Sequence, residues 1–364
     1  MKKYVLSALV LAIAGAAFGQ SLCDYRTPET SIEDLKVSLY YRHYDVPTAP
    51  GPEISSGRIY ANYTHIYDSP DLGYSLTGSA EVELAGFSFA GIAGQGAATV
   101  RRYLAKGAPY FAFGGLESTW SSSFSHPGVE VRAGLGYGHF TDVTPMAKAI
   151  RIEERLLAMN AIPASLPGET LNSVAQIIGS SAEYEKLSDL VADVAKAIQD
   201  ASGATLNAKA LLAIEEIVKE TGRSRYCGYA IQLGLGYQLV NPQDQNREFV
   251  ITASADGALA PEPGSQLLVR ASLSGPYDIL DKHVLTITAS YDYQLNSTTS
   301  FTAEYSLRQV KPAGQAPAGD QSASFQLSLN LGQAELSLQV TFSKTAEAPS
   351  WTQDIIISVG MDLL

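Results

Sequence analysis

The chain has 364 residues, of which 46% are hydrophobic and 17% are charged, and its formal net charge is −12 at pH 7. This acidity excludes nucleic acid as an expected partner, because binding to phosphates requires a basic surface. Only two cysteines occur, Cys23 and Cys227, and neither has the paired spacing of a zinc site.

Residues 1–19 have the pattern of a secretory signal peptide. Lys2 and Lys3 form a basic start, an apolar run follows, and Ala17 and Gly19 are the small residues expected before a cleavage site. Removing this segment changes the formal charge to −14, because it contains two lysines and no acidic residue. The mature chain is therefore expected to be exported. No later run reaches the ~18 apolar residues of a membrane-spanning helix.

Most of the mature chain alternates apolar and polar residues with a period of two, as half-buried strands do. In residues 72–84, for example, Leu72, Tyr74 and Leu76 share one face, while Ser75 and Thr77 share the other. Six such runs are predicted in residues 20–142 and eight in residues 224–364. They last about ten residues or more, against a mean of roughly 5–6 for strands of soluble domains. A tilted membrane-spanning strand needs ~9–11 residues.

The predicted connections alternate between short and long. The short ones are 68–71, 106–109, 296–299 and 332–334, and the long ones, rich in Pro and Gly, are 46–57, 240–247 and 310–321. Outer-membrane barrels have this asymmetry, with short periplasmic turns and long outer loops. The predicted fold class is therefore an all-β transmembrane antiparallel barrel of about 14 strands, roughly 12 to 16, with an inserted α-helical subdomain.

Residues 143–223 change to a helical period and form the predicted insertion on the periplasmic side. Thr144 before Pro145 is typical of an N-cap followed by proline at the first helical position. Cys23 precedes the first strand and Cys227 follows the helices, so both are expected on the same side of the membrane. A disulfide between them is expected in an exported chain, and two unpaired thiols are the alternative.

Several charged residues fall on the polar faces of predicted strands and are candidate lumen charges. They are Glu81, Glu83, Arg132, Arg270 and Asp292. In an open lumen such charges select which ions pass. The alternative is a closed lumen in which acids and bases pair and fill the space.

Two glycine-rich strands flank the helical insertion. Their glycines lie on the face predicted to line the lumen: Gly134, Gly136, Gly138, Gly234 and Gly236. The spacing G-x-G-x-G does not match a dinucleotide-binding fingerprint. Because glycine in strands often marks a close approach of other backbone, we expect this strip to leave room for helix or loop atoms.

A search for catalytic or metal-binding patterns assigns no catalytic, cofactor or metal residue. The five histidines lie more than five residues apart, and neither an HExxH motif, a G-x-S-x-G elbow nor a phosphate-binding P-loop occurs. The chain is therefore not expected to be an enzyme or to need a cofactor.

The mature chain resembles bacterial outer-membrane β-barrel proteins, through its signal peptide, its long alternating strands and its last run, "DIIISVGMDLL". Proteins of this class usually end in an amphipathic strand, often with a final Phe where this chain has Leu364. The resemblance implies location in the cell outer membrane, contact with its lipid, and recognition by the barrel assembly machinery.

The first functional hypothesis is a passive diffusion pore with a periplasmic helical module. The second is a structural envelope protein, in which the barrel is an anchor and the helices bind a periplasmic or cell-wall partner. A secreted soluble β-protein is the third. The fourth is an outer-membrane lipid-modifying enzyme, which would need a Ser–His pair on the outward, membrane-facing surface.

Overall fold

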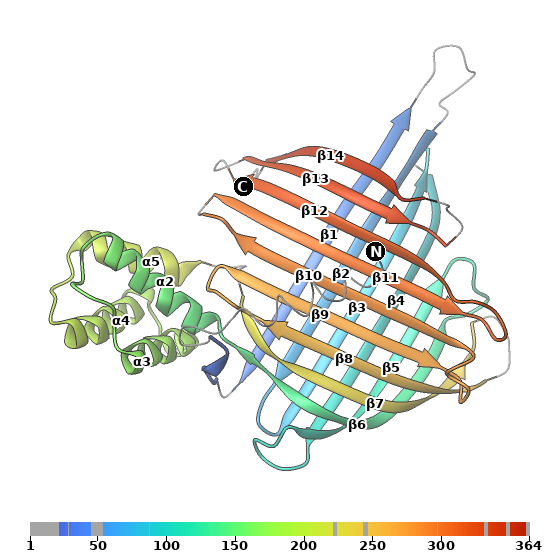
Figure 1. Cartoon of the computed structure of the whole chain (residues 1–364), viewed down its shortest axis with the longest axis horizontal. Helices are drawn as coiled ribbons and strands as arrows, with labels where there is room; N and C mark the ends of the chain where they lie inside the picture. Colours follow the sequence, from blue (N-terminus) through green and yellow to red (C-terminus); the bar gives the residue numbers. More distant parts are fainter. Residues whose placement is uncertain are drawn as a thin grey trace.

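The computed structural model describes residues 22–27, 29–44, 54–86, 88–220, 224–242, 247–296, 298–330, 334–346 and 350–361. The predicted signal peptide, residues 1–19, lies outside this set. The described part is a large antiparallel sheet with a helical unit attached at one end (Figure 1). Among the described residues, no helix is long and apolar enough to cross a bilayer.

Among the described residues, the sheet has fourteen strands, and each pairs antiparallel with the next along the chain, from β1 to β14. The strands are β1 (Thr30–Tyr44), β2 (Ile54–Asp68), β3 (Leu72–Ala85), β4 (Ser88–Tyr103), β5 (Tyr110–Ser121), β6 (Gly128–Asp142), β7 (Tyr226–Val240), β8 (Phe249–Leu259), β9 (Ser265–Gly275), β10 (His283–Gln294), β11 (Thr299–Lys311), β12 (Ala318–Asn330), β13 (Ala334–Lys344) and β14 (Thr352–Met361). The prediction of an antiparallel β-protein with helices is confirmed.

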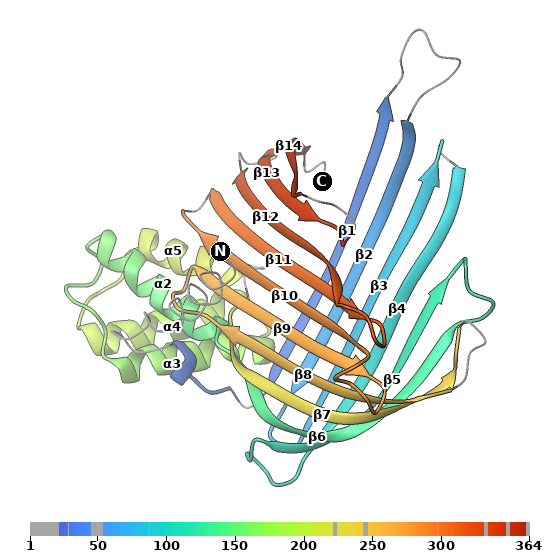
Figure 2. The same ribbon diagram turned by 45° about the vertical axis from the view of Figure 1, so that its right-hand side comes forward.

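The sheet is curled but not closed, which differs from the predicted barrel. Strands β1–β5 cross behind β8–β14, and β6 and β7 form the fold between them (Figures 1 and 2). Within the described chain, no pairing joins β1 to β14. The first residue of β1 bonds to β6 instead: the Asp142 N–H donates to Thr30 Oγ1 at 2.9 Å. This contact holds the start of the edge strand inside the curl.

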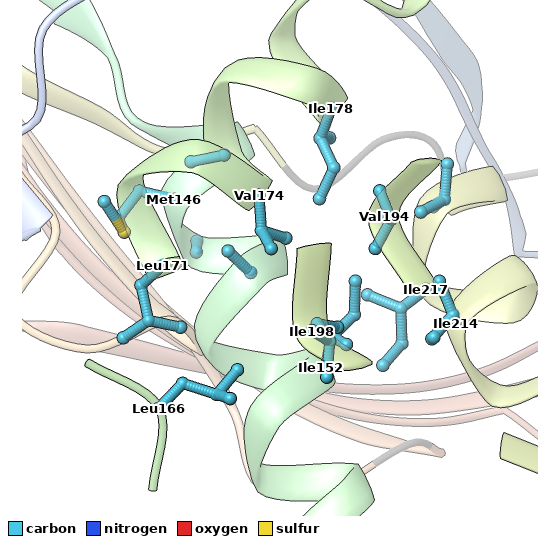
Figure 3. Close-up of a cluster of buried hydrophobic side chains, with 14 of the residues drawn as sticks. Met146, Ile152, Leu166, Leu171, Val174, Ile178, Val194, Ile198, Ile214 and Ile217 are labelled. Atoms are coloured by element: carbon cyan, nitrogen blue, oxygen red, sulfur yellow. The ribbon is translucent and has the colours of Figure 1, made fainter. Parts of the chain in front are cut away.

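In the described part of the chain between β6 and β7 lie four α-helices: α2 (Thr144–Ala158), α3 (Gly168–Gly179), α4 (Leu187–Ser202) and α5 (Ala208–Lys219). Each helix is amphipathic, and burial of its apolar face stabilises the unit. Figure 3 shows this core, in which Ile152, Val174, Val194, Ile198 and Ile214 are almost completely buried. The helical unit therefore has a hydrophobic core of its own.

The start of α2 differs by one residue from the predicted cap. Thr144 is the first helical residue and Val143 the N-cap residue. The Thr144 hydroxyl accepts instead from the Arg225 N–H at 2.8 Å, and the Thr144 N–H donates to Asp142 Oδ1 at 2.8 Å. The Thr144 side chain thus connects the start of the helical unit to Arg225, which follows its last helix.

The N-terminal segment belongs to the helical unit. A short 3₁₀ turn, η1 (Leu22–Asp24), leads into it, and both Leu22 and Tyr25 are buried in the helical core. A disulfide joins Cys23 to Cys227 at the start of β7. The segment before β1 is thus fixed beside the middle of the sheet.

Candidate functional site on the concave face of the sheet

Strand alternation gives the sheet two chemically different faces. The convex face carries large apolar side chains that are exposed, including Leu116, Leu135, Ile231, Leu233, Leu235, Phe249, Ile355 and Ile357. The other face is concave, because side chains of non-neighbouring strands meet on it: Asp68 of β2 contacts His139 and the Phe140 backbone of β6. Such a large exposed apolar surface is typical of proteins that contact membranes or partners.

Four of the five candidate lumen charges form ion pairs on the concave face. Arg58 approaches Glu81 at 3.4 Å and Glu83 at 3.9 Å. Arg270 Nε lies 2.5 Å from Asp256 Oδ1. Because these pairs are partly exposed, each contributes little to stability, about 0–1 kcal/mol.

The candidate charge Arg132 lies between two carboxylates. Its guanidinium pairs with Glu117 on β5 and with Glu130, at 2.6 Å, on its own strand. Asp292, the fifth candidate, accepts a hydrogen bond from the Thr302 hydroxyl at 2.9 Å. The five predicted positions are therefore spread over the concave face rather than gathered in one ring.

The concave face is filled at the end nearest the helices. Tyr103, Phe111, Phe140, Tyr226, Ala230 and Ala258 are buried there in one cluster. The Arg101 guanidinium stacks over the Phe111 ring at 5.6 Å from its centroid, within cation–π range. Arg101 is itself buried, and its Nε has no hydrogen-bond partner among the described residues. We call these side chains the closed end.

The polar part of the closed end surrounds Asp68, which is fully buried. Tyr103 donates to Asp68 Oδ1 at 2.8 Å, and the Phe140 N–H donates to Asp68 Oδ2 at 3.2 Å. His139 Nδ1 lies 3.1 Å from the Tyr103 hydroxyl and 3.2 Å from Asp68 Oδ2. This network closes the curl between β2, β4 and β6. Sequence reasoning did not bring these residues together, because they are up to 72 residues apart in the chain.

The glycine strip does not receive helix or loop atoms, so that expectation was wrong. A Cβ at Gly136 would lie 2.3 Å from the Phe111 ring, and one at Gly134 would lie 2.7 Å from the Phe113 ring. Gly234 faces the same Phe113 ring at 2.8 Å, Gly236 faces Glu130, and Gly138 faces the backbone of Tyr229 and Ala230. Rings of β5 therefore cover Gly134, Gly136 and Gly234, while Gly138 and Gly236 face atoms of the adjacent strands β7 and β6.

The convex face carries one Ser–His contact near the helix side. Ser31 Oγ of β1 lies 3.4 Å from His65 Nε2 of β2. Glu33 is directly opposite His65 in the strand pairing, and its carboxylate accepts from the Tyr63 hydroxyl at 3.0 Å. A serine, a histidine and a carboxylate thus share this face, although the carboxylate bonds to tyrosine.

The described residues contain no group of three or more His, Cys, Asp or Glu side chains that could hold a metal ion. No model of a known protein family and no curated protein matches this sequence.

Proposed function

We propose that this protein is an outer-membrane β-barrel channel for small solutes, with the helical unit on the periplasmic side. The observation that carries the proposal is the two-faced sheet, whose convex face is apolar and exposed while its concave face holds charges and hydroxyls. A bilayer favours this arrangement, with apolar side chains toward lipid and polar ones toward a lumen.

Closure of the sheet in the membrane is part of this proposal. In lipid the free edges of β1 and β14 would leave backbone groups without hydrogen bonds, at a cost of several kcal/mol for each group. Because the number of strands is even, β1 and β14 run in opposite directions, so their pairing would continue the antiparallel pattern. The closed end would narrow the lumen on the helix side.

Reconstitution into planar bilayers tests the channel. The expected result is stepwise conductance from protein whose gel mobility changes on boiling, as folded barrels show. A Phe111→Ala variant, which removes the most buried ring of the closed end, should conduct more per channel than the native protein. No conductance from inserted, heat-modifiable protein would contradict the proposal. The filled end would then favour the structural envelope role, with the helices as the partner-binding part.

A second candidate function, lipid modification, is favoured by the Ser31–His65 contact. A histidine next to a serine can act as the base that activates the hydroxyl, and this pair lies on the face proposed to contact lipid. A serine-reactive fluorophosphonate probe tests it: labelling of Ser31 that His65→Ala removes would support an enzyme. The absence of labelling on folded protein would leave Ser31–His65 as an ordinary cross-strand contact.

A further inference from the structure

The far side of the concave face, away from the helices, holds a cavity that the closed end and the ion pairs do not explain. Its volume is about 450 Å³. The residues around it come from β2 to β5 and the turn that follows β5: Tyr60, Ser79, Ala80, Glu81, Ala93, Gly94, Gln95, Thr119, Trp120, Ser121, Ser123 and Phe124. We call this set the hydroxyl pocket.

The turn after β5 builds one wall of the pocket. The Ser122 N–H donates to the Ile92 carbonyl at 2.7 Å, and the Ile92 N–H donates to Ser122 Oγ at 3.3 Å. The Phe124 N–H closes the turn on the Ser121 carbonyl at 3.0 Å. These hydrogen bonds hold the turn against β4 and thereby fix the positions of Ser123 and Phe124.

Three polar side chains of the hydroxyl pocket are available to a ligand, while the Ser121 and Ser123 hydroxyls bond to each other at 2.9 Å. Among the described residues, none hydrogen-bonds to the side chains of Ser79, Gln95 or Thr119. Gln95 offers both a donor and an acceptor, and each hydroxyl can do either. Groups that can each donate or accept a hydrogen bond are suited to a ligand with several hydroxyls.

The charge of the pocket is low. Glu81 is the single carboxylate in its lining, and Arg58 lies 3.4 Å from it. This neighbour offsets the negative charge, so the pocket favours neither an anion nor a cation. Tyr60 and Phe124 add apolar ring surface, against which the C–H face of a sugar can pack. Trp120 is also part of the lining, and its indole lies against Gly94.

We infer that the hydroxyl pocket binds a neutral polyhydroxylated solute, of the size of a mono- or disaccharide, on its way through the lumen. The inference rests on the proposed channel function, because it names the class of solute that the channel carries. Hydroxyls and the amide of Gln95 would bind the ring hydroxyls, and Tyr60 and Phe124 would lie along the apolar edge of the ring.

Calorimetric titration of the detergent-solubilised protein tests the pocket without any measurement of transport. The probes are maltose, sucrose and glucose, with glucosamine and glucuronate as charged counterparts. Saturable binding of a neutral sugar, and weaker binding of both charged analogues, is the expected result. Gln95→Ala and Tyr60→Ala should each weaken binding about tenfold, as expected for one or two lost hydrogen bonds or a lost ring contact.

Two matched variants control for structural damage. Tyr60→Phe keeps the ring and should stay within about threefold of the native affinity, because its hydroxyl contributes at most one hydrogen bond. Tyr63→Ala removes a ring from the opposite face of the same strand and should leave sugar affinity unchanged. Equal binding by native protein and Gln95→Ala, or no saturable binding of any neutral sugar, would overturn the inference.

The failure of the pocket and the failure of the channel are distinguishable. Conductance without sugar binding would contradict the proposed sugar pocket and support the channel. Sugar binding without conductance would support the pocket and contradict the channel. Where both hold, added maltose should reduce the conductance of native channels, and it should have less effect on the Tyr60→Ala variant.

Discussion

At the residue scale, the packing of the concave face depends on pairs of a bare glycine and an aromatic ring from the next strand. Phe111 is fully buried and lies over Gly136, while Phe113 lies over Gly134 and Gly234. A side chain at any of these three glycines would compete with the ring for the same space. The glycines thus permit large rings inside a strongly curled sheet, where alternating large and small residues are needed to fill the taper.

Gly136→Ala should destabilise the protein by about 1–3 kcal/mol, because the new methyl group overpacks the Phe111 ring. The measurement is the free energy of unfolding in urea, in detergent. Gly257→Ala in β8 is the matched control, since a Cβ there meets no atom within 4 Å; its effect should be within about 0.5 kcal/mol. Equal stability of Gly136→Ala and the native protein would show that the ring can move aside.

Tyr25 gives a second prediction at this scale. Burial in the helical unit, and to a lesser extent the Asp142 carboxylate, raises the pKa of its phenol to about 12. Because the folded-state pKa is above the ordinary value, the unfolded chain releases this proton first as the pH rises. The stability that depends on neutral Tyr25 should therefore be complete below about pH 10 and lost between about pH 10 and 12.

Circular dichroism of the helices against pH measures this loss. Tyr25→Phe should remove this part of the alkaline destabilisation, while the contribution of the other tyrosines and lysines remains. An alkaline profile that is identical in native protein and variant would contradict a buried phenol at this position.

At the element scale, the helical unit holds together three parts of the sheet that are distant in sequence. The end of β6 enters α2, β7 follows α5, and the segment before β1 is buried among the helices and joined to β7 by Cys23–Cys227. Thr30 then ties the first residue of β1 to β6. The helices therefore fix where the edge strand begins.

Replacing Cys23 and Cys227 together by serine should lower the free energy of unfolding of the helical unit by about 2–4 kcal/mol, because the unfolded chain gains freedom when a long loop is opened. The helical circular dichroism signal in urea, with and without reducing agent, measures this change. Native protein should respond to the reducing agent and the double variant should not. Unchanged midpoints in both would mean that packing of Leu22 and Tyr25 alone holds the segment.

At the scale of the whole molecule, the two faces of the sheet predict opposite responses to a new charge. Leu233 on the convex face is 63% exposed, and its neighbour Gln232 belongs to the concave face. In the proposed membrane orientation, Leu233→Arg should cost about 2–4 kcal/mol near the middle of the bilayer.

Gln232→Arg is the matched control, since the same charge on the same strand would point toward water. The measurement is the fraction of protein that folds into lipid vesicles, followed by heat-modifiable gel mobility. Leu233→Arg should reduce this fraction strongly, and Gln232→Arg should leave it close to native. Equal folding of both variants would exclude a lipid-facing convex surface.

The sequence by itself determined the local structure of this protein. A period of two places each strand and assigns Glu81, Arg132, Arg270 and Asp292 to the polar face, because neighbouring side chains of a strand point to opposite sides. The change to a helical period locates the helices in the same way, since amphipathic helices need one apolar side to pack. Both periodicities depend only on residues that are close together in the sequence, so one sequence is enough to detect them.

Only the tertiary structure decided how distant segments meet. It left the sheet open where closure was predicted, and it covered three of the five strip glycines with Phe111 and Phe113. It also brought Asp68, Tyr103 and His139 into one network. It also gathered Tyr60 and Gln95 around one cavity. The alternation of apolar and polar residues predicts which face of the sheet a side chain takes. The curvature of the sheet decides which distant strands lie opposite that face. The contacts found in the curled sheet, such as Phe111 over Gly136 and Asp68 with the Phe140 backbone, join residues far apart in the sequence and therefore have no local sequence pattern.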